Sequence, residues 1–426
     1  MFIYNAWYVA AFAADIEAGK TLGRKYLNKA VVLFRTESGE IAALEDRCSH
    51  RAMPLSSGHV DGDVIRCCYH GVEFDGKGTC TRIPNQARIP AAANVRHYPV
   101  VEKDHLIWIW MGEPALADPS IIVDSPEHND PAWTWRPYNF PVKANWQLII
   151  DNIMDLTHVP YIHARTIGGN PEQHYNADTK VEFDGRKVTL LRKMPNSIPP
   201  KSYIDAGGFK GRVDRWQEVR FEPGIGMTCR VNAGGCDAGT GAYEGKRDNG
   251  FMLANNHFIT PETETTSHYL WTICTTAPKE SGVPDVLFDQ FFDTITEDEV
   301  TLEAQQRRID DEPERAFVGT PAMARSTRRG GCSARCRKRR MAARSLPEPP
   351  CLAYISNIAA CPVRCAMLYR HHEDARTGGS DRGSSGDNPR LSARRIDPGA
   401  RAAAQDGCRL WGGACPGDPV CASAPA

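Results

Sequence analysis

The chain has 426 residues, of which 41% are hydrophobic, and its formal net charge at pH 7 is −1. This length is sufficient for more than one buried core, and no apolar run is long enough to span a membrane. The composition is typical of a soluble enzyme, with neither a membrane nor a nucleic acid as its partner.

The first 20 residues are apolar, but Asp15 and Glu17 come early and no basic residue precedes the apolar stretch. That pattern is typical of a first strand and not of a signal peptide. We therefore expect a cytoplasmic protein whose thiols are reduced. Short alternating runs with turn residues between them then predict a small antiparallel β domain, with strands at 30–35, 41–46 and 106–111.

Two short Cys/His pairs lie in the predicted loops of this domain. Cys48 and His50 form the first pair, and Cys67 and His70 form the second. A Rieske [2Fe-2S] cluster has two Cys on one iron and two His on the other. A structural zinc site also uses two Cys and two His, but zinc fingers usually group like ligands together. The mixed pairs favour the Rieske cluster, and Cys68 is expected to be a small buried side chain.

A helix is predicted over 145–158, where apolar residues recur at helical spacing. Asn152, Asp155 and His158 fall three residues apart and would form a polar ridge along it. Two interpretations of Asn152 stay open. It could support a ligand, or it could be a polar residue at a contact between helices.

His163 lies five residues beyond His158, so the two rings would diverge in an unbroken helix. Pro160 is expected to break the helix and to let both rings reach one point. Two His and one carboxylate form the facial triad of non-haem Fe(II) oxygenases, which leaves coordination positions open. The third ligand must then come from another part of the chain.

The second half of the chain mixes β-rich stretches with one clear helix. The stretches lie at 180–193, 226–234 and 267–276, and the helix lies at 297–309. Taken alone, this pattern indicates an α+β fold.

The last part of the chain, residues 319–426, differs in composition from the rest. It contains 18 basic residues against 8 acidic ones, and 8 of the 15 cysteines. Basic runs often bind nucleic acid, its Cys pairs could suggest zinc, and a disordered extension would have a similar composition. We favour a shifted reading frame in GC-rich coding sequence as the source of this Arg/Ala/Gly/Pro/Cys mixture.

Several stretches resemble the oxygenase subunit of the Rieske non-haem iron aromatic oxygenases. "NAWYVAA", "LIWIWMGEPALADP", "DNIMDLTHVPYIH" and "ITPETETTSHY" are similar to the group of vanillate O-demethylase, toluenesulfonate methyl-monooxygenase and dicamba demethylase. The similarity is expected to span roughly residues 1 to 318. It implies an antiparallel β Rieske domain at 1–115 and a helix-grip catalytic domain, a curved antiparallel sheet with helices over the iron, at 116–318.

The resemblance also implies the site residues. His158, His163 and Asp298 would bind one mononuclear Fe(II), with Glu297 and Glu299 as alternatives to Asp298 as the third ligand. An acidic helix segment of this kind also often only complements the helix dipole.

Asp155 would bridge an iron-binding His to the Rieske His70 of a neighbouring subunit, within a head-to-tail homotrimer. Electrons from NAD(P)H would arrive through a separate flavin/ferredoxin-type reductase, because a Rieske cluster cannot take a hydride. The expected reaction inserts oxygen from O2 into a small aromatic acid, by O-demethylation of a methoxybenzoate such as vanillate or by hydroxylation of an aryl methyl group.

Two other functions stay open. A ring or angular dihydroxylating dioxygenase would share both metal sites, and a non-catalytic Rieske electron-transfer protein would need only the first. The substrate's anion would need a polar partner in an apolar pocket, and His257 and Arg230 are the candidates. Both could equally be surface or structural polar residues.

Overall fold

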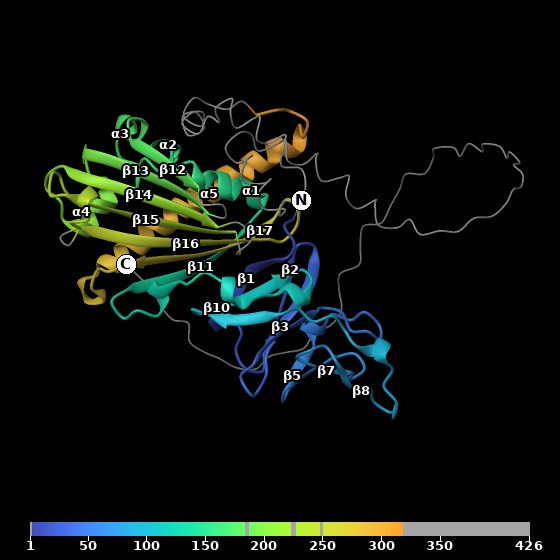
Figure 1. The fold of residues 1–426 in the computed structure, drawn as a ribbon. Coiled ribbons are helices and arrows are strands. Elements are labelled where there is room, and N and C mark those ends of the chain that lie inside the picture. The colour runs from blue at the N-terminus through green and yellow to red at the C-terminus, as the bar shows by residue number, and fades with distance from the viewer. Residues whose placement is uncertain (1, 184–186, 223–226, 248–249, 318–426) are drawn as a thin grey trace, which may run out of the picture. The chain divides into compact units, whose positions relative to one another are not determined.

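The computed structural model describes residues 2–183, 187–222, 227–247 and 250–317 (Figure 1). Within them the chain forms four antiparallel sheets and five α-helices. The prediction of a shifted or disordered tail at 319–426 lies outside the described residues, and the domain boundary expected at residue 115 stays a prediction. In the described part, no helix combines the length and apolar character needed to cross a bilayer.

Three small sheets make up the N-terminal domain. The first has the order β1-β10-β9, with strands Ala6–Phe12, Leu106–Met111 and Val100–Lys103. The second has the order β2-β3-β4, with strands Thr21–Tyr26, Lys29–Arg35 and Ile41–Glu45. The third has the order β5-β6-β7-β8, with strands His59–Asp61, Val64–Arg66, Glu73–Asp75 and Cys80–Arg82. The predicted strands at 30–35, 41–46 and 106–111 are thus confirmed as β3, β4 and β10.

Strand β3 belongs to two hydrophobic cores at once. Successive side chains of a strand point to opposite faces of its sheet. Val31 and Leu33 therefore pack into the main core of the chain, which continues into the C-terminal helices. Val32 and Phe34 pack on the other side, in a second core that includes the Cys48 thiol.

The catalytic domain expected from the resemblance is built on one seven-stranded antiparallel sheet, in the order β11-β17-β16-β15-β14-β13-β12. Its strands, given in chain order, are Thr134–Val142, Asp178–Phe183, Val188–Ser197, Val213–Glu222, Thr228–Asp237, Phe251–Pro261 and Ser267–Thr275. The three β-rich stretches predicted from the sequence are confirmed as β12 with β13, β15 and β17. The α+β class is confirmed with them.

Helices cover one face of this sheet (Figure 1). They are α1 (Trp146–Met154), α2 (Val159–Ile162), α3 (Pro171–Tyr175), α4 (Lys201–Gly207) and α5 (Val283–Asp311). Tyr138 of β11 stacks on Trp271 of β17, and its ring lies 5.1 Å from that of Phe292 on α5. On the opposite face, Phe258 packs edge-on against Trp108 of the N-terminal domain.

Two predicted helices have different bounds in the structure. The helix expected over 145–158 ends at Met154, because the backbone leaves helical geometry at Asp155 (φ −112°, ψ 84°). The helix expected over 297–309 is the second half of α5, which begins at Val283. Pro284 in its first turn needs no helical N–H partner there, so it marks the start of the helix.

Candidate metal centres

The first ligand candidate of the mononuclear site lies in the turn between α1 and α2. Nδ1 of His158 lies 2.6 Å from the backbone carbonyl of Asp155. A carbonyl oxygen only accepts, so Nδ1 carries the hydrogen and Nε2 keeps a free lone pair. Pro160 lies within the first turn of α2 and does not break α1, contrary to expectation. The helix has already ended when the chain reaches it.

His163 follows the last residue of α2 and is only 1% exposed. Its Nδ1 donates to Glu297 Oε2 at 2.8 Å, and its Nε2 lies 3.1 Å from Asp298 Oδ1. A carboxylate that holds the outer nitrogen of an imidazole in this way fixes the ring and makes the inner nitrogen a stronger ligand.

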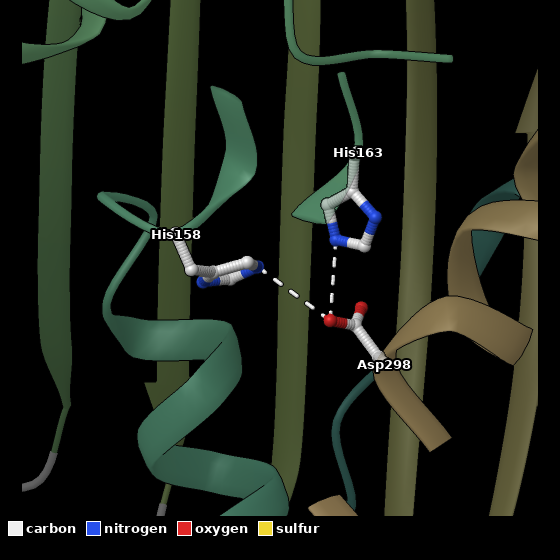
Figure 2. A group of neighbouring side chains, drawn as sticks. All are labelled: His158, His163 and Asp298. Carbon is white, nitrogen blue, oxygen red and sulfur yellow. Dashed lines mark ion pairs between the residues drawn. The ribbon is translucent and has the colours of Figure 1, made fainter. Parts of the chain in front are cut away.

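The three candidate ligands meet at one point. Figure 2 shows the His158 and His163 rings directed at the Asp298 carboxylate from α5, in front of the sheet. One donor atom from each residue lies within 4.8 Å of the other two. His158 Nε2 is 3.6 Å from Asp298 Oδ1, and the two ring planes are 77° apart. This nitrogen–nitrogen–oxygen set fits one Fe(II) with open positions.

Asn152 joins α1 to α5 at this site. Its Nδ2 donates to Asp298 Oδ1 at 3.0 Å. Asn152 therefore contacts a candidate ligand from a neighbouring helix, and a supporting role for it stays a prediction. Glu297, an alternative third ligand, instead contacts the outer nitrogen of His163. Neither it nor Glu299 belongs to the convergent group.

The two imidazoles differ in their electrostatic surroundings. Burial lowers the pKa of His158. Burial also lowers the pKa of His163, but the hydrogen bonds and charges of Asp298 and Glu297 outweigh it, and the net pKa is raised. A metal binds only neutral imidazole, so iron and a proton compete for His163 Nε2.

The Cys/His pairs lie on two loops of the same construction. The N–H of Cys48 donates to the Met53 carbonyl, and the Cys48 carbonyl accepts from Ala52. The N–H of Cys67 likewise donates to the carbonyl five residues on, and its carbonyl accepts from the residue four on, Gly71. Ala52 (φ 59°) and Gly71 (φ 68°) both adopt left-handed geometry. Two matching loops thus face each other.

The side chains of these loops separate into two kinds. Cys48 and Cys67 are buried, whereas the His50 and His70 rings are exposed, with centroids 4.4 Å apart. Burial raises the pKa of the Cys48 thiol, and the neighbouring Cys67 thiol raises it further. Cys68 is exposed, so the expectation that it is buried is wrong.

These four residues fit a two-iron cluster better than a single zinc ion. A tetrahedral zinc site would draw all four donor atoms to one centre. Among the described residues, however, the group with donor atoms close enough for one ion is the His/His/Asp set. Paired thiols beside paired imidazoles instead match the two ends of a Rieske cluster.

The structure separates the two substrate candidates. His257 on β16 shares a row with Cys229 and Trp271 on the helix-covered face, and its Nδ1 hydrogen-bonds the Tyr269 hydroxyl at 2.6 Å. Burial lowers the pKa of His257 to about 3, so the ring is neutral.

Arg230, one position further along β15, lies in the next row and therefore on the opposite face of the sheet. It forms an ion pair there with the buried carboxylate of Glu127. The structure does not bring Arg230 to the iron site, and its charge is already balanced.

Two polar groups near His257 escaped the sequence reasoning. Asn255 and Trp271 point to the helix-covered face, and within the described part of the chain Asn255 Oδ1 and Trp271 Nε1 are buried without a partner. Polar residues inside an otherwise apolar strand were the available signal. A hollow of about 580 Å³ lined by Asn196, Asp214 and Tyr243 contains none of the predicted site residues. We therefore locate the site by the convergent donor atoms.

Known proteins match both parts of the chain. Residues 6–99 match the Rieske [2Fe-2S] domain, and residues 142–343 match the vanillate O-demethylase oxygenase C-terminal domain. The second match runs to residue 343, past residue 318, near which we expected the family similarity to end.

Individual relatives agree with the domain matches. The iron-sulfur subunit of the toluene-4-sulfonate monooxygenase system of Comamonas testosteroni is 36% identical, over 76% of this chain and 94% of its own. The oxygenase component of dicamba O-demethylase from Stenotrophomonas maltophilia is 36% identical, over 72% of this chain and 89% of its own. A crystal structure of dicamba monooxygenase with non-heme iron and dicamba has a TM-score of 0.60 and 30% identity, and the match covers 81% of this chain and 99% of that one.

The sheet, the His/His/Asp group and the paired Cys/His loops define a two-centre iron oxygenase. This chain belongs to the Rieske oxygenases, in the family of the vanillate O-demethylase, toluenesulfonate monooxygenase and dicamba monooxygenase oxygenase subunits. It is an oxidoreductase that has a Rieske [2Fe-2S] domain and a mononuclear iron site. The relatives are monooxygenases and demethylases, which favours oxygenation of a methyl group over ring dihydroxylation.

Proposed function

We propose that this chain oxidises the methyl group of a small aromatic acid with O2. O-Demethylation of a methoxybenzoate such as vanillate is the first candidate reaction, and hydroxylation of an aryl methyl group is the second. One oxygen atom enters the methyl group and the other leaves as water, with two electrons and one proton from NAD(P)H and a second proton from solvent. A methoxy group then breaks down to a phenol and formaldehyde. The convergence of His158, His163 and Asp298 in a chain that also has Rieske loops carries this proposal.

His158, His163 and Asp298 would hold the mononuclear iron. Fe(II) bound there supplies the activation of O2. The protein's own contribution is to fix the three donors before the metal arrives. The Asp155 carbonyl, the Glu297 carboxylate and the Asn152 amide each hold one of them in orientation.

Cys48 and Cys67 would hold one iron of the cluster, and His50 and His70 the other. The exposed position of both imidazoles supports a role in electron transfer, because it leaves their outer nitrogens open to a partner. A bound cluster supplies single electrons. A flavin/ferredoxin-type reductase that draws on NAD(P)H is the proposed source of these electrons.

Asp155 is the proposed bridge to a second subunit. Its Oδ1 accepts from Thr157 N–H and Oγ1, at 3.1 and 2.6 Å. Oδ2 has no hydrogen-bond partner among the described residues, so it is free to accept from His70 of the partner subunit. A head-to-tail homotrimer would supply that contact from one subunit to the next.

The substrate is proposed to lie between the helices and the sheet, on the face that carries His257. Around His257 that face is largely aromatic and aliphatic, with Asn255 and Trp271 as buried polar side chains beside it. Such a site suits a small aromatic ring with one anionic or polar substituent. The proposed location in the cell is the cytoplasm, in keeping with the free thiols of all seven cysteines in the described residues.

A substrate panel tests this proposal. The full-length protein, with iron and cluster loaded, is reduced anaerobically, mixed with methoxybenzoates or toluenesulfonates, and exposed to O2. Formaldehyde with a phenol, or a benzyl alcohol, is the expected product. A cis-diol or a catechol formed without loss of a methyl group would instead identify a dioxygenase.

A further inference from the structure

Two buried arginines lie beneath the segment that carries both candidate histidine ligands. Arg192 on β13 and Arg215 on β14 are 4% and 1% exposed. Within the described ranges, no carboxylate lies at ion-pair distance from either guanidinium, which is unusual for buried charges. Their hydrogen bonds instead go to backbone carbonyl groups and to the Gln217 amide, and Arg215 also lies over the Tyr203 ring.

Arg192 joins the two ends of the ligand-bearing segment. Its Nη1 donates to the Leu156 carbonyl at 3.2 Å, and its Nη2 donates to the His174 carbonyl at 2.8 Å. His158 and His163 both lie between these two residues. Gln217, which faces Arg192 across the strand pair, accepts from Nη1 at 2.9 Å and so fixes the plane of the guanidinium.

Arg215 and His174 hold the middle of the same segment. Arg215 Nη2 donates to the Ile167 carbonyl at 3.3 Å, and His174 Nε2 donates to the Gly168 carbonyl at 2.6 Å. The Gly168 N–H in turn donates to the carbonyl of His163 at 2.9 Å. Burial and the charges of Arg215 and Arg192 lower the pKa of His174 to about 3, so this imidazole adds no third charge.

We propose that Arg192 is a positioning residue of the mononuclear iron site, which clamps the Leu156–His174 segment to the sheet so that His158 and His163 face Asp298. The inference rests on the proposed function of those three residues. Between α1 and α3 the segment has only the four-residue helix α2, and no strand pairs with it. Its backbone therefore depends on side-chain donors.

Arginine is the side chain suited to this role. Its planar fork presents donors in two directions, whereas lysine offers one point charge. Burial and the charge of Arg215 lower the pKa of Arg192 to about 10, so the side chain stays charged at pH 7. Metal ligation tolerates displacements of only tenths of an ångström, and loss of the clamp should therefore be felt at the metal.

Fe(II) binding by the purified full-length protein, with its cluster intact, tests the proposal. Arg192→Met keeps the aliphatic stem but loses every donor, Arg192→Lys keeps one donor group, and Arg220→Met removes an exposed arginine of β14 that pairs with Glu218. We expect R192M to weaken Fe(II) binding about 10- to 100-fold and to alter the EPR spectrum of the ferrous nitrosyl adduct. R192K should fall between R192M and wild type, and R220M should match wild type.

Wild-type Fe(II) affinity with an unchanged nitrosyl spectrum in R192M would overturn the clamp. A purely structural role would produce that result together with a lower melting temperature. Should R192M fail to fold, Gln217→Leu carries the test, because it frees the guanidinium plane and is expected to weaken Fe(II) binding by a smaller factor. An unchanged affinity in Q217L would then count against the clamp. A wild-type protein that binds no Fe(II) would overturn the proposed function itself.

Discussion

The backbone carbonyl of Asp155, and not its carboxylate, accepts the hydrogen bond from His158 Nδ1. The two halves of one residue thus have separate tasks. The main chain orients a candidate iron ligand, while one carboxylate oxygen has no hydrogen-bond partner among the described residues and is the proposed contact to a partner subunit.

Asp155→Ala should therefore leave both metal sites loaded and block electron transfer between subunits. We expect Fe(II) and cluster content to stay at wild-type levels and the single-turnover rate to fall on the order of 10²-fold. Rapid mixing of reduced protein with O2 and substrate, followed by product analysis, measures this rate. Thr157→Val, which removes only the Oγ1 contact to that carboxylate, is the control. Full turnover in D155A would exclude the bridge.

Glu297→Gln tests the carboxylate behind His163. The amide still accepts from Nδ1 but lacks the charge that strengthens the imidazole as a ligand. We expect Fe(II) affinity to fall about 10-fold, measured by anaerobic titration. Glu299→Gln, two residues further along α5 and outside the donor group, should bind iron as wild type does. Equal losses in both variants would point to general helix electrostatics.

Cys67 and Cys68 are adjacent in one Rieske loop, and we expect opposite effects on cluster binding when each is replaced. Cys67→Ser should abolish the cluster, because a buried thiolate ligand is lost. Cys68→Ser alters an exposed neighbour and should keep the visible absorption and EPR signal of the cluster. Loss of the signal in C68S, or its retention in C67S, would contradict the assignment.

His257 makes stability depend on pH. Its pKa is about 3 in the folded chain, against an ordinary value near 6.5, so the unfolded chain takes up a proton first as pH falls. The ring therefore lowers the free energy of unfolding by about 1.4 kcal/mol per pH unit below pH 6.5, down to about pH 3.

Urea unfolding at pH 6 and pH 5 checks this dependence. The free energy of unfolding should fall between pH 6 and pH 5 by about 1.2 kcal/mol less in His257→Asn than in wild type. His59→Asn, a variant of an exposed histidine, serves as the control and should keep the wild-type slope. A wild-type slope in H257N would show that the ring is not held neutral.

The sequence was sufficient for those features that depend on local spacing. The Cys/His loops, the His158 and His163 pair and most strands follow from short patterns; the strands are confirmed, and the two histidines lie in one group with Asp298. The sequence could not predict features that depend on how a helix or strand is rotated about its own axis. Glu297 and Asp298 lie about 100° apart on α5, so their separate contacts depend on how that helix packs.

The faces of a strand are equally hard to assign from sequence. Successive side chains of a strand alternate, so Arg230 and its neighbours must point to opposite faces of the sheet, but the pattern does not say which face carries the iron site. The end of α1 at Met154 likewise depends on an early turn that apolar periodicity does not mark. No sequence motif marks the two buried arginines, because they bind backbone carbonyls of a distant segment as well as side chains of the sheet.

Because β3 lines both hydrophobic cores, the N-terminal domain has no independent hinge at that strand. Thr260 Oγ1 also donates to the Val9 carbonyl at 2.7 Å, and Leu27 N–H donates to the Pro261 carbonyl at 2.9 Å. We therefore expect the N-terminal domain to keep its position on the catalytic sheet and not to move as a separate unit. If the proposed assembly forms, electrons from the Rieske domain would therefore cross a fixed distance to the iron site, and subunit contacts rather than domain motion would set it.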